Sequence, residues 1–445
     1  MWSKLRLRNF KGYADTDILS LRPLTILIGP NGGGKSTILK FFMTLKQTVE
    51  STDTRTPLIS SVDEEKGGYV DIGLFKDYVY MGKEKEIIQF ELQWDNQDDP
   101  RVSLGKEYGY FVDGIKVGLK RGQRKNEVVV ESLKYLYGPN QQELVTLSRG
   151  ERAAYNATIP NFSVSNELSK GKKEFSPQKF YRFSPQMLKV IPPDREEFLR
   201  RYASEFEKAI LRTYYLGPLR QNPQRYYLAT GETPDDLGLK GQKIGTVLYA
   251  NPGGNLLNQA NHWLRELDIV NTLKLSRISR GNLFSLDVIG RNQRYAVNIS
   301  DYGFGASQIL PVIIESLYSP SASTILVEQP EIHLNAHHQL KLPNFFASQV
   351  HHQANTSKQF IIETHSEYFL KRLSTLVAKK ELLPTEISIL YCYADDTGCH
   401  IKPIDLDEQG RYSWWPKDFL SEGFEGSAEY IEAIQSEEGE VDAGE

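Results

Sequence analysis

The chain has 445 residues, of which 40% are hydrophobic and 25% are charged, an ordinary composition for a globular protein of two or three domains. Its formal net charge of −4 excludes a uniformly basic nucleic-acid-binding protein, so contacts with nucleic acid would need local patches. No apolar run approaches membrane-spanning length, and the N-terminus alternates like a strand and lacks the apolar core of a signal peptide, so we expect a cytoplasmic protein with no membrane partner.

The N-terminal part of the chain carries a complete phosphate-binding loop. Residues 2–10 and 17–28 have the alternating and then apolar pattern of strands, and residues 29–37 continue as GPNGGGKST. A helix pattern starts at Ser36 and runs to about Leu45. This strand, glycine-rich turn and helix are the setting in which G-x-x-x-x-G-K-[ST] holds the phosphates of ATP or GTP. A turn that only closed a hairpin would explain neither the Lys-Ser-Thr end nor the change from strand to helix.

Each residue type in this loop has a physical role in holding a nucleotide. The glycines let the backbone curl until its N–H groups point at phosphate oxygens, and the helix N-terminus adds partial positive charge. Lys35 can reach the β- and γ-phosphates, and the Ser36 hydroxyl can hold Mg²⁺. The sequence therefore predicts ATP and Mg²⁺ as cofactors. The predicted nucleotide contacts are Gly29, Pro30, Asn31, Gly32, Gly33, Gly34, Lys35, Ser36 and Thr37.

The middle of the chain is expected to form an antiparallel sheet followed by an insertion. Alternating strand patterns occur at residues 69–75, 87–94, 110–119 and 126–133, with a turn at Asp113-Gly114. Residues 139–190 are polar and mixed, and residues 196–211 have the pattern of an amphipathic helix. A set of basic residues could face a phosphate backbone or could form a solvated charged face. This set is Lys116, Lys120, Arg121, Arg124, Lys125, Lys170, Lys172 and Lys173.

The C-terminal part has the element order of a parallel α/β sheet. Buried strands are expected at residues 323–328, 359–363 and 387–393, with helices between them at 336–350 and 366–380. Further helices are expected at residues 254–266 and from about Ser307, and residues 282–299 alternate like strands. Cys392 and Cys399 flank a predicted turn and are expected to be free thiols. The same turn, Ala394-Asp395-Asp396, imitates a polymerase motif but is interpreted as a hairpin.

Two neighbouring strands of this part end in residues suited to phosphate chemistry. The strand at residues 323–328 ends in Glu328, an acid placed where nucleotidases hold Mg²⁺ opposite the phosphate loop. Gln329 follows it, and Glu331 lies two residues further on. His365 follows the next strand, from where it can reach a γ-phosphate.

A fourth phosphate-directed element leads to a family resemblance. Residues 301–311, DYGFGASQILP, form a glycine-rich turn in which Ser307 is expected to open a helix, and such a helix start binds anions. The order of phosphate loop, Gly-Ser-Gln signature, acidic strand end and histidine resembles the ABC-class ATPases, especially their SMC, RecF and OLD branch. The resemblance implies an α/β fold. It would be a P-loop NTPase head of ABC type with a mixed or parallel sheet, an antiparallel β subdomain and an inserted helical region.

The same resemblance implies that two subunits together form each ATP site. ATP would be sandwiched in a dimer or higher oligomer, with the signature segment of one subunit contacting the γ-phosphate bound by the other. The signature residues assigned to this contact are Gly305, Ser307 and Gln308. His365 would act as the switch histidine.

Motifs outside the loop resemble a narrower group. EQPEIHL, GFGxSQxLP, YLGPLR and WWPKDF are similar to a bacterial subfamily of predicted ATPases with a C-terminal domain of unknown function, over residues 1–50 and 210–424. The wider group includes the ATPase subunits of Septu-type phage defence systems, which work beside a separately encoded effector. We therefore expect ATP-dependent dimerisation that controls a separately encoded effector, with a nuclease as the expected kind, in antiphage defence.

One position departs from the ABC pattern and keeps alternatives open. ABC ATPases usually carry a Glu where this chain has Gln329, and an amide cannot accept a proton from water at neutral pH. Glu331 could act in place of the usual Glu, or ATP hydrolysis could be slow. Glu328, Gln329, Glu331 and His365 are thus the predicted catalytic residues, and Ser36 and Glu328 the predicted Mg²⁺ ligands. The alternatives are a RecF-like or SMC-like DNA-repair ATPase that binds DNA, and a non-hydrolysing scaffold that ATP holds together.

The expected organisation has five parts. They are residues 1–50, the first part of the head; 51–138, its antiparallel part; 139–215, an inserted variable and helical region; 216–400, the second part of the head; and 401–445, an extension with an acidic tail.

Overall fold

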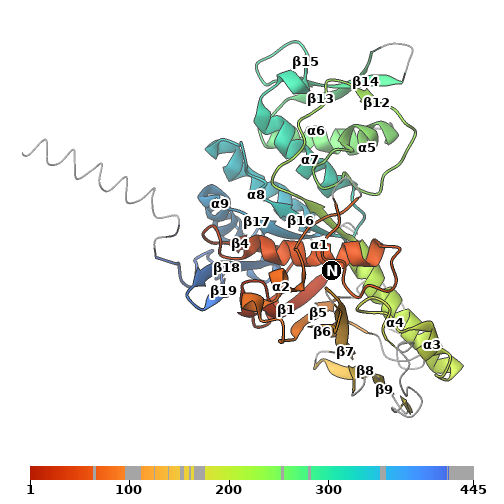
Figure 1. Ribbon diagram of the computed structural model, residues 1–445. Coiled ribbons are helices and arrows are strands. Elements are labelled where there is room, and N and C mark those ends of the chain that lie inside the picture. The colour runs from red at the N-terminus through yellow and green to blue at the C-terminus, as the bar shows by residue number, and fades with distance from the viewer. Residues whose placement is uncertain are drawn as a thin grey trace, which may run out of the picture.

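The structure, a computed structural model, describes most of the chain. The described residues are 1–63, 67–95, 112–124, 126–138, 140–150, 155–159, 162–164, 176–251, 255–278, 282–350, 357–417 and 419. Within them the backbone forms three sheets, with nine, six and four strands, and helices that pack between and around them (Figure 1).

The six-stranded sheet at the centre of the molecule joins the two ends of the chain. Its strands lie in the order β11 (Thr213–Leu216), β16 (Thr324–Glu328), β17 (Gln359–Glu363), β4 (Leu24–Ile28), β18 (Ile387–Asp395) and β19 (Gly398–Ile404). All neighbours in this order are parallel except β18 and β19. The parallel α/β sheet expected from the element order is therefore confirmed. The N-terminal strand β4 lies between two C-terminal strands.

Both faces of this sheet are covered, which explains why its strands are apolar along their whole length. Every residue of β4, β16 and β17 is buried. Leu27 and Ile361 face a core shared with α1 (Lys35–Glu50) and the nine-stranded sheet. Their neighbours Ile26 and Ile362 face the opposite core, which α7 (Phe304–Tyr318), α8 (Ala336–Val350) and α9 (Glu367–Ala378) complete.

The nine-stranded sheet packs on the other side of α1 (Figure 1). Its strands are β1 (Trp2–Phe10), β2 (Tyr13–Asp15), β3 (Leu19–Ser20), β5 (Ile88–Trp94), β6 (Gly114–Arg121), β7 (Val128–Tyr137), β8 (Gln142–Arg149), β9 (Tyr155–Ile159) and β10 (Phe162–Val164). The pairings are antiparallel throughout, as the alternating patterns of residues 87–133 predict.

Two expectations for the start of this region are corrected. Residues 69–75 do not form a strand, because Asp71 makes only an isolated bridge with Ser61 and the short helix α2 (Phe75–Tyr78) follows. Gly114 is not in a turn but begins β6, where it pairs with Gln93 and Leu136.

The polar stretch from residue 139 is not a helical insertion at its start, since β8, β9 and β10 extend the sheet. Its mixed polarity arises because a strand can bury alternate residues, such as Val145 and Leu147, and expose the rest. The helical part comes later, as α3 (Pro185–Leu188) and α4 (Pro193–Leu211), which confirms the amphipathic helix predicted there. The five-part division of the chain itself stays a prediction.

The four-stranded sheet forms a lobe that supports α7 (Figure 1). It contains β12 (Tyr227–Leu228), β13 (Thr272–Arg277), β14 (Leu283–Ile289) and β15 (Val297–Asn298), with α5 (Ile244–Ala250) and α6 (Asn255–Glu266) packed against it. The predicted helix at 254–266 and the strand pattern at 282–299 are thereby confirmed. Trp263 of α6 contacts Phe345 of α8 with ring centroids 5.2 Å apart, which joins the lobe to the central layers.

The remaining short elements connect these layers. They are the 3₁₀ turns η2 (Tyr80–Gly82), η6 (Ile299–Asp301) and η7 (Pro384–Glu386). Asp395 and Gly398 pair across the β18–β19 turn, which confirms the hairpin interpretation, and both Cys392 and Cys399 are free. In the described part of the chain, none of the helices has the length and apolarity needed to span a membrane.

Candidate nucleotide-binding site

The carboxyl ends of three neighbouring strands place the phosphate loop and the strand-end acids at one edge of the central sheet. The loop 29–34 follows β4, Glu328 ends β16, and Glu363 ends β17. Glu328 and Glu363 are direct neighbours in register, and Glu363 is also in register with Leu27, just before the loop. Carboxyl ends of parallel strands share one sheet edge, so residues more than 300 positions apart in sequence meet here.

The phosphate loop has the backbone that its glycines permit. Gly29 has a φ of 135° and Gly34 a φ of 92°, both in the region that favours glycine. The loop also lies directly against β18, since a Cβ atom on Gly29 would stand 1.9 Å from the carbonyl oxygen of Cys392 and one on Gly33 would stand 2.4 Å from it. Two separate constraints thus explain the glycines at this turn: the positive φ angles and the close approach of the loop backbone to Cys392.

We predict that Gly29→Ala destabilises the protein by about 1–3 kcal/mol or more, because the added methyl group overlaps backbone that cannot move freely. Gly303→Ala is the matched control. An added Cβ there meets no atom within 4 Å, and φ is −56°. Chemical denaturation of both variants measures the difference, and equal stabilities would show that the close approach to Cys392 is wrong.

Lys35 begins α1 and is folded over the loop that precedes it. Its side chain is only 4% exposed, and Nζ donates hydrogen bonds to the carbonyl oxygens of Gly29 and Pro30, each at 2.9 Å. Burial lowers the pKa of Lys35, while the carboxylates of Glu363 and Glu328 oppose that shift. The ammonium group is therefore held by the loop carbonyls and feels the negative charge of the two strand-end acids.

Ser36 has a partner that the sequence interpretation missed. Its hydroxyl donates a hydrogen bond of 2.7 Å to Oε2 of Glu363. Glu363 lies in the segment IIETHSEYF, where only His365 had been singled out. The signal available was an acid at the end of an apolar strand, the same feature that identifies Glu328.

Glu328 is fixed by Tyr215 of β11 and by Arg220, which follows that strand. The hydroxyl of Tyr215 donates to its Oε1 at 2.6 Å, and Arg220 donates to the carbonyl oxygens of Glu328 at 2.7 Å and Gln329 at 3.3 Å. Burial raises the pKa of Glu328 and lowers that of Arg220 to about 10. The YLGPLR segment therefore holds the acidic strand end in place.

Gln329, Glu331 and His365 surround the mouth of the site. Gln329 adopts a left-handed φ of 45°, and its N–H donates to the carbonyl oxygen of Glu363 at 2.8 Å. Glu331 accepts a hydrogen bond from the backbone N–H of His365 at 2.8 Å through Oε1. Its other carboxylate oxygen, Oε2, is buried. Burial raises the pKa of Glu331, and burial together with Lys35 lowers that of His365.

These residues line an open cleft with a volume of about 410 Å³. Its walls include Asn31 from the phosphate loop, Gln329 and Glu331 after β16, and His365 after β17. The cleft therefore brings three separately predicted elements, the loop, the acidic strand end and the histidine, to one surface. A polar, open cleft beside a phosphate loop suits a triphosphate better than an apolar ligand.

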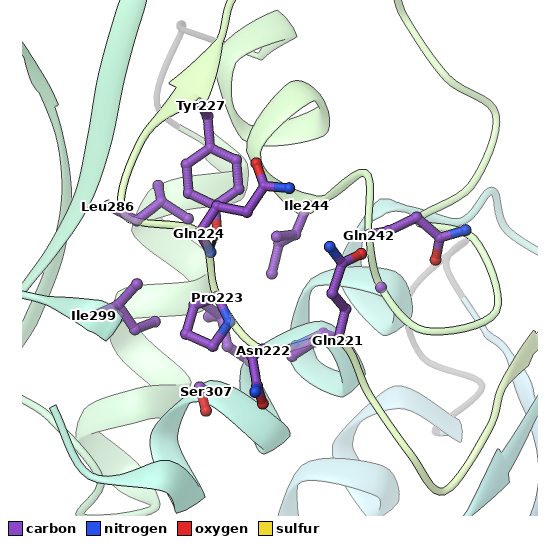
Figure 2. Close-up of a pocket in the computed structure, with 13 residues that line it drawn as sticks. Gln221, Asn222, Pro223, Gln224, Tyr227, Gln242, Ile244, Leu286, Ile299 and Ser307 are labelled. Atoms are coloured by element: carbon purple, nitrogen blue, oxygen red, sulfur yellow. Dashed lines mark hydrogen bonds between the residues drawn. The ribbon is translucent and has the colours of Figure 1, made fainter. Parts of the chain in front are cut away.

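The signature segment is placed differently from the sequence expectation. α7 begins at Phe304, with Gly303 as its N-cap, so Ser307 does not open the helix. Ser307 is buried, and its hydroxyl donates to the carbonyl oxygen of Phe304 at 2.7 Å. Figure 2 shows it beneath the loop that carries Asn222 and Pro223, in a small pocket separate from the cleft.

Gly305 and Gln308 likewise pack against other parts of the same chain. A Cβ on Gly305 would stand 2.8 Å from the carbonyl oxygen of His333, and Gln308 is buried in α7. The ring of Phe304 packs on His333, with centroids 4.5 Å apart, and His333 lines the cleft. The N-terminus of α7 is thus linked to the cleft by the contact of Phe304 with His333. The residues of the cleft that lie beside the phosphate loop come from the segments after β16 and β17.

Comparisons with known proteins were made against families, curated proteins and solved structures. A family model described as "AAA ATPase domain" matches residues 1–191. A second, described as "AAA domain, putative AbiEii toxin, Type IV TA system", matches residues 146–371, just over half of the chain. None of the curated proteins matches.

Solved structures with a similar backbone include two head domains. The SMC head domain from Thermotoga maritima is 11% identical with a TM-score of 0.38, over 91% of this chain and 99% of that one. The Smc head domain from Pyrococcus furiosus, with an extended coiled coil and bound to the C-terminal domain of ScpA, is 9% identical with a TM-score of 0.42, over 98% and 99%. By the family match, the chain is a P-loop ATPase that belongs to the AAA domain family described as "putative AbiEii toxin, Type IV TA system".

Proposed function

We propose that the protein binds ATP with Mg²⁺ and hydrolyses it in the cleft at the carboxyl edge of the central sheet. The observation that carries the proposal is the meeting of the phosphate loop, the strand-end acids and His365 at that edge. In this proposal the loop residues 29–37 hold the phosphates. Lys35 neutralises charge on the β- and γ-phosphates. His365, whose pKa is lowered, contacts the γ-phosphate as a neutral imidazole.

The donors at this edge fit Mg²⁺. The Ser36 hydroxyl and the carboxylate of Glu328 are hard oxygen ligands, which Mg²⁺ prefers, and it commonly takes one or two carboxylates together with substrate phosphates. Bound there, the ion would neutralise part of the negative charge of the phosphates during hydrolysis. The chain's own residues would orient the nucleotide and the attacking water.

Glu331 is the proposed acceptor of the proton from water. Gln329 can orient a water molecule through its amide but cannot take the proton. Glu331 lines the cleft, and one of its carboxylate oxygens is held by the backbone N–H of His365. Its raised pKa brings it closer to the range in which a carboxylate acts as a general base.

We further propose that two subunits close over ATP and that this state controls a separately encoded effector, a nuclease for example, in antiphage defence. The ATPase subunits of Septu-type systems, which the sequence resembles, and the family description of a toxin in a type IV TA system support a defence role. Gly305, Ser307 and Gln308 would act on the ATP of the opposite subunit by way of the α7 N-terminus. Phe304 at that terminus packs on His333 but is 47% exposed, so its exposed side could make such a contact.

Phe304→Glu is predicted to abolish ATP-dependent dimerisation while leaving ATP binding to the single subunit unchanged, because a charge would be buried at the interface. Light scattering with and without ATP measures the mass. This variant is a cleaner test than Ser307→Arg, whose added bulk would disrupt the buried start of α7. Tyr368→Glu, at a residue 44% exposed on α9, is the control and should still dimerise. An unchanged ATP-dependent mass in Phe304→Glu would contradict the proposed interface.

The DNA-binding alternative is weakened because two basic residues of the predicted set, Lys116 and Arg121, already pair with acids. Lys116 pairs with Glu91 at 3.3 Å, and Arg121 pairs with Glu84. Lys125, Lys170, Lys172 and Lys173 lie outside the described residues. We therefore propose no second function.

A further inference from the structure

We propose that Glu363 is a magnesium ligand of the ATP site and the acid that shares the ion with Ser36, with Glu328 as the second carboxylate. This inference rests on the proposed ATPase function. It goes beyond that function because it assigns a metal-binding role to a residue outside the predicted phosphate loop and acidic strand end.

The contact between Ser36 and Glu363 has the geometry of two ligands of one ion. Mg²⁺ holds its oxygen ligands at about 2.1 Å in an octahedron, so adjacent ligand oxygens lie about 3 Å apart. The Ser36 Oγ and Glu363 Oε2 atoms are 2.7 Å apart. A shift of a few tenths of an ångström would turn this hydrogen-bonded pair into two adjacent ligands.

Glu328 is less available than Glu363 for a direct bond to the ion. The hydroxyl of Tyr215 already occupies its Oε1, at 2.6 Å. Glu328 and Glu363 are direct neighbours on parallel strands, whose backbones lie about 4.8 Å apart. A cation at Ser36 could therefore contact both acids, with Glu363 as the nearer of the two to the hydroxyl.

Burial makes a purely structural role for Glu363 costly. The residue is 5% exposed at the end of the apolar strand QFIIE, beside a second buried acid. A buried carboxylate needs a compensating charge, and a single hydrogen bond from a neutral hydroxyl is weak compensation. Lys35 supplies one positive charge nearby, but its ammonium is bonded to the carbonyls of Gly29 and Pro30. A dication at Ser36 would complete the charge balance of the two acids.

The test compares nucleotide affinity with and without metal in Glu363→Gln and in the wild-type protein. A fluorescent ATP analogue is titrated in Mg²⁺ and in EDTA, and electron paramagnetic resonance counts Mn²⁺ bound in the presence of ADP. We expect Mg²⁺ to tighten binding in the wild type and this tightening to fall at least tenfold in Glu363→Gln. In EDTA the variant should bind the analogue as well as the wild type or better, because a negative charge beside the phosphates is gone.

The variant Glu363→Gln distinguishes a metal-binding role of Glu363 from a purely structural one. Its amide oxygen can still accept the hydrogen bond from Ser36, so a purely structural role would leave the effect of Mg²⁺ unchanged. Glu386→Gln is the control, since Glu386 is buried and its carboxylate accepts from the N–H of Leu383, in a 3₁₀ turn away from the cleft. Melting curves check that each variant folds, and Glu363→Asp, which keeps the charge, should recover part of the Mg²⁺ effect.

Two different failures can be told apart. Full Mg²⁺ enhancement and full Mn²⁺ occupancy in folded Glu363→Gln would overturn the assignment of Glu363 and leave the proposed function standing. A wild-type protein that binds the analogue neither in Mg²⁺ nor in EDTA would overturn the proposed function, and the inference with it.

Discussion

Lys35→Ala is expected to weaken ATP binding by about 10- to 100-fold, the largest loss of affinity among single changes in the chain. A hydrogen bond from a charged group contributes about 1.5–3 kcal/mol, and each 1.4 kcal/mol is a factor of ten in affinity. Lys35 is the buried lysine of the phosphate loop, and its ammonium is held at the loop by the carbonyl oxygens of Gly29 and Pro30. Isothermal titration with ATP measures the loss.

Two further variants make this result specific. Lys379→Ala removes an exposed lysine beyond the end of α9 and should bind ATP as the wild type does. Lys35→Met keeps most of the side-chain volume, so it guards against a loss that comes only from a cavity. Wild-type affinity for ATP in either Lys35 variant would contradict the proposal that the phosphate loop binds the nucleotide.

Glu331→Gln is expected to lower ATP turnover by about 10²- to 10⁴-fold while ATP still binds, as is usual when a general base is lost. The amide keeps the size of the side chain and its acceptor for the His365 N–H, so the local structure should persist. The measurement is phosphate release together with ATP affinity. The trapped ATP-bound dimer should be more abundant in this variant than in the wild type.

The reverse change at position 329 tests whether Gln329 limits turnover. Gln329→Glu should leave turnover unchanged or raise it, because it restores the acid that ABC ATPases usually carry there. Burial raises the pKa of Glu331 above the usual 4.5, and a base acts only when deprotonated, so the rate should fall as pH drops through that raised pKa. Turnover that survives in Glu331→Gln would contradict the role of Glu331.

Strong local patterns made much of the fold predictable from the sequence. The loop GPNGGGKST and the apolar runs of β16, β17 and β18 each identify their element without reference to the rest of the chain. The order of strands and helices then implied a parallel sheet, and parallel strands bring their carboxyl ends to one edge. Glu328 and His365 could therefore be placed near the loop before any contact was known.

Features that depend on contacts between distant segments could not be read from the sequence. The strands β8 and β9 looked polar because one of their faces is not buried. Ser307 looked like a helix start, but Gly303 provides the N-cap and the hydroxyl turns back onto Phe304. Glu363 was overlooked beside His365, and its contact with Ser36 spans residues that only the insertion of β4 beside β17 brings together.

Arg220 shows the same limit. Before the fold is known, only the resemblance of the YLGPLR segment draws attention to Arg220. In the fold, its guanidinium holds the backbone of Glu328 and of the left-handed Gln329. A buried arginine that supports the acidic strand end is visible only once β11 lies beside β16.

The most direct test of the central claim is ATP turnover by the purified wild-type protein, measured alongside its mass with and without ATP. We predict Mg²⁺-dependent phosphate release together with an ATP-dependent increase in mass, both lost in Lys35→Ala. ATP binding and assembly without any turnover would contradict an ATPase cycle and would support a scaffold that ATP holds together.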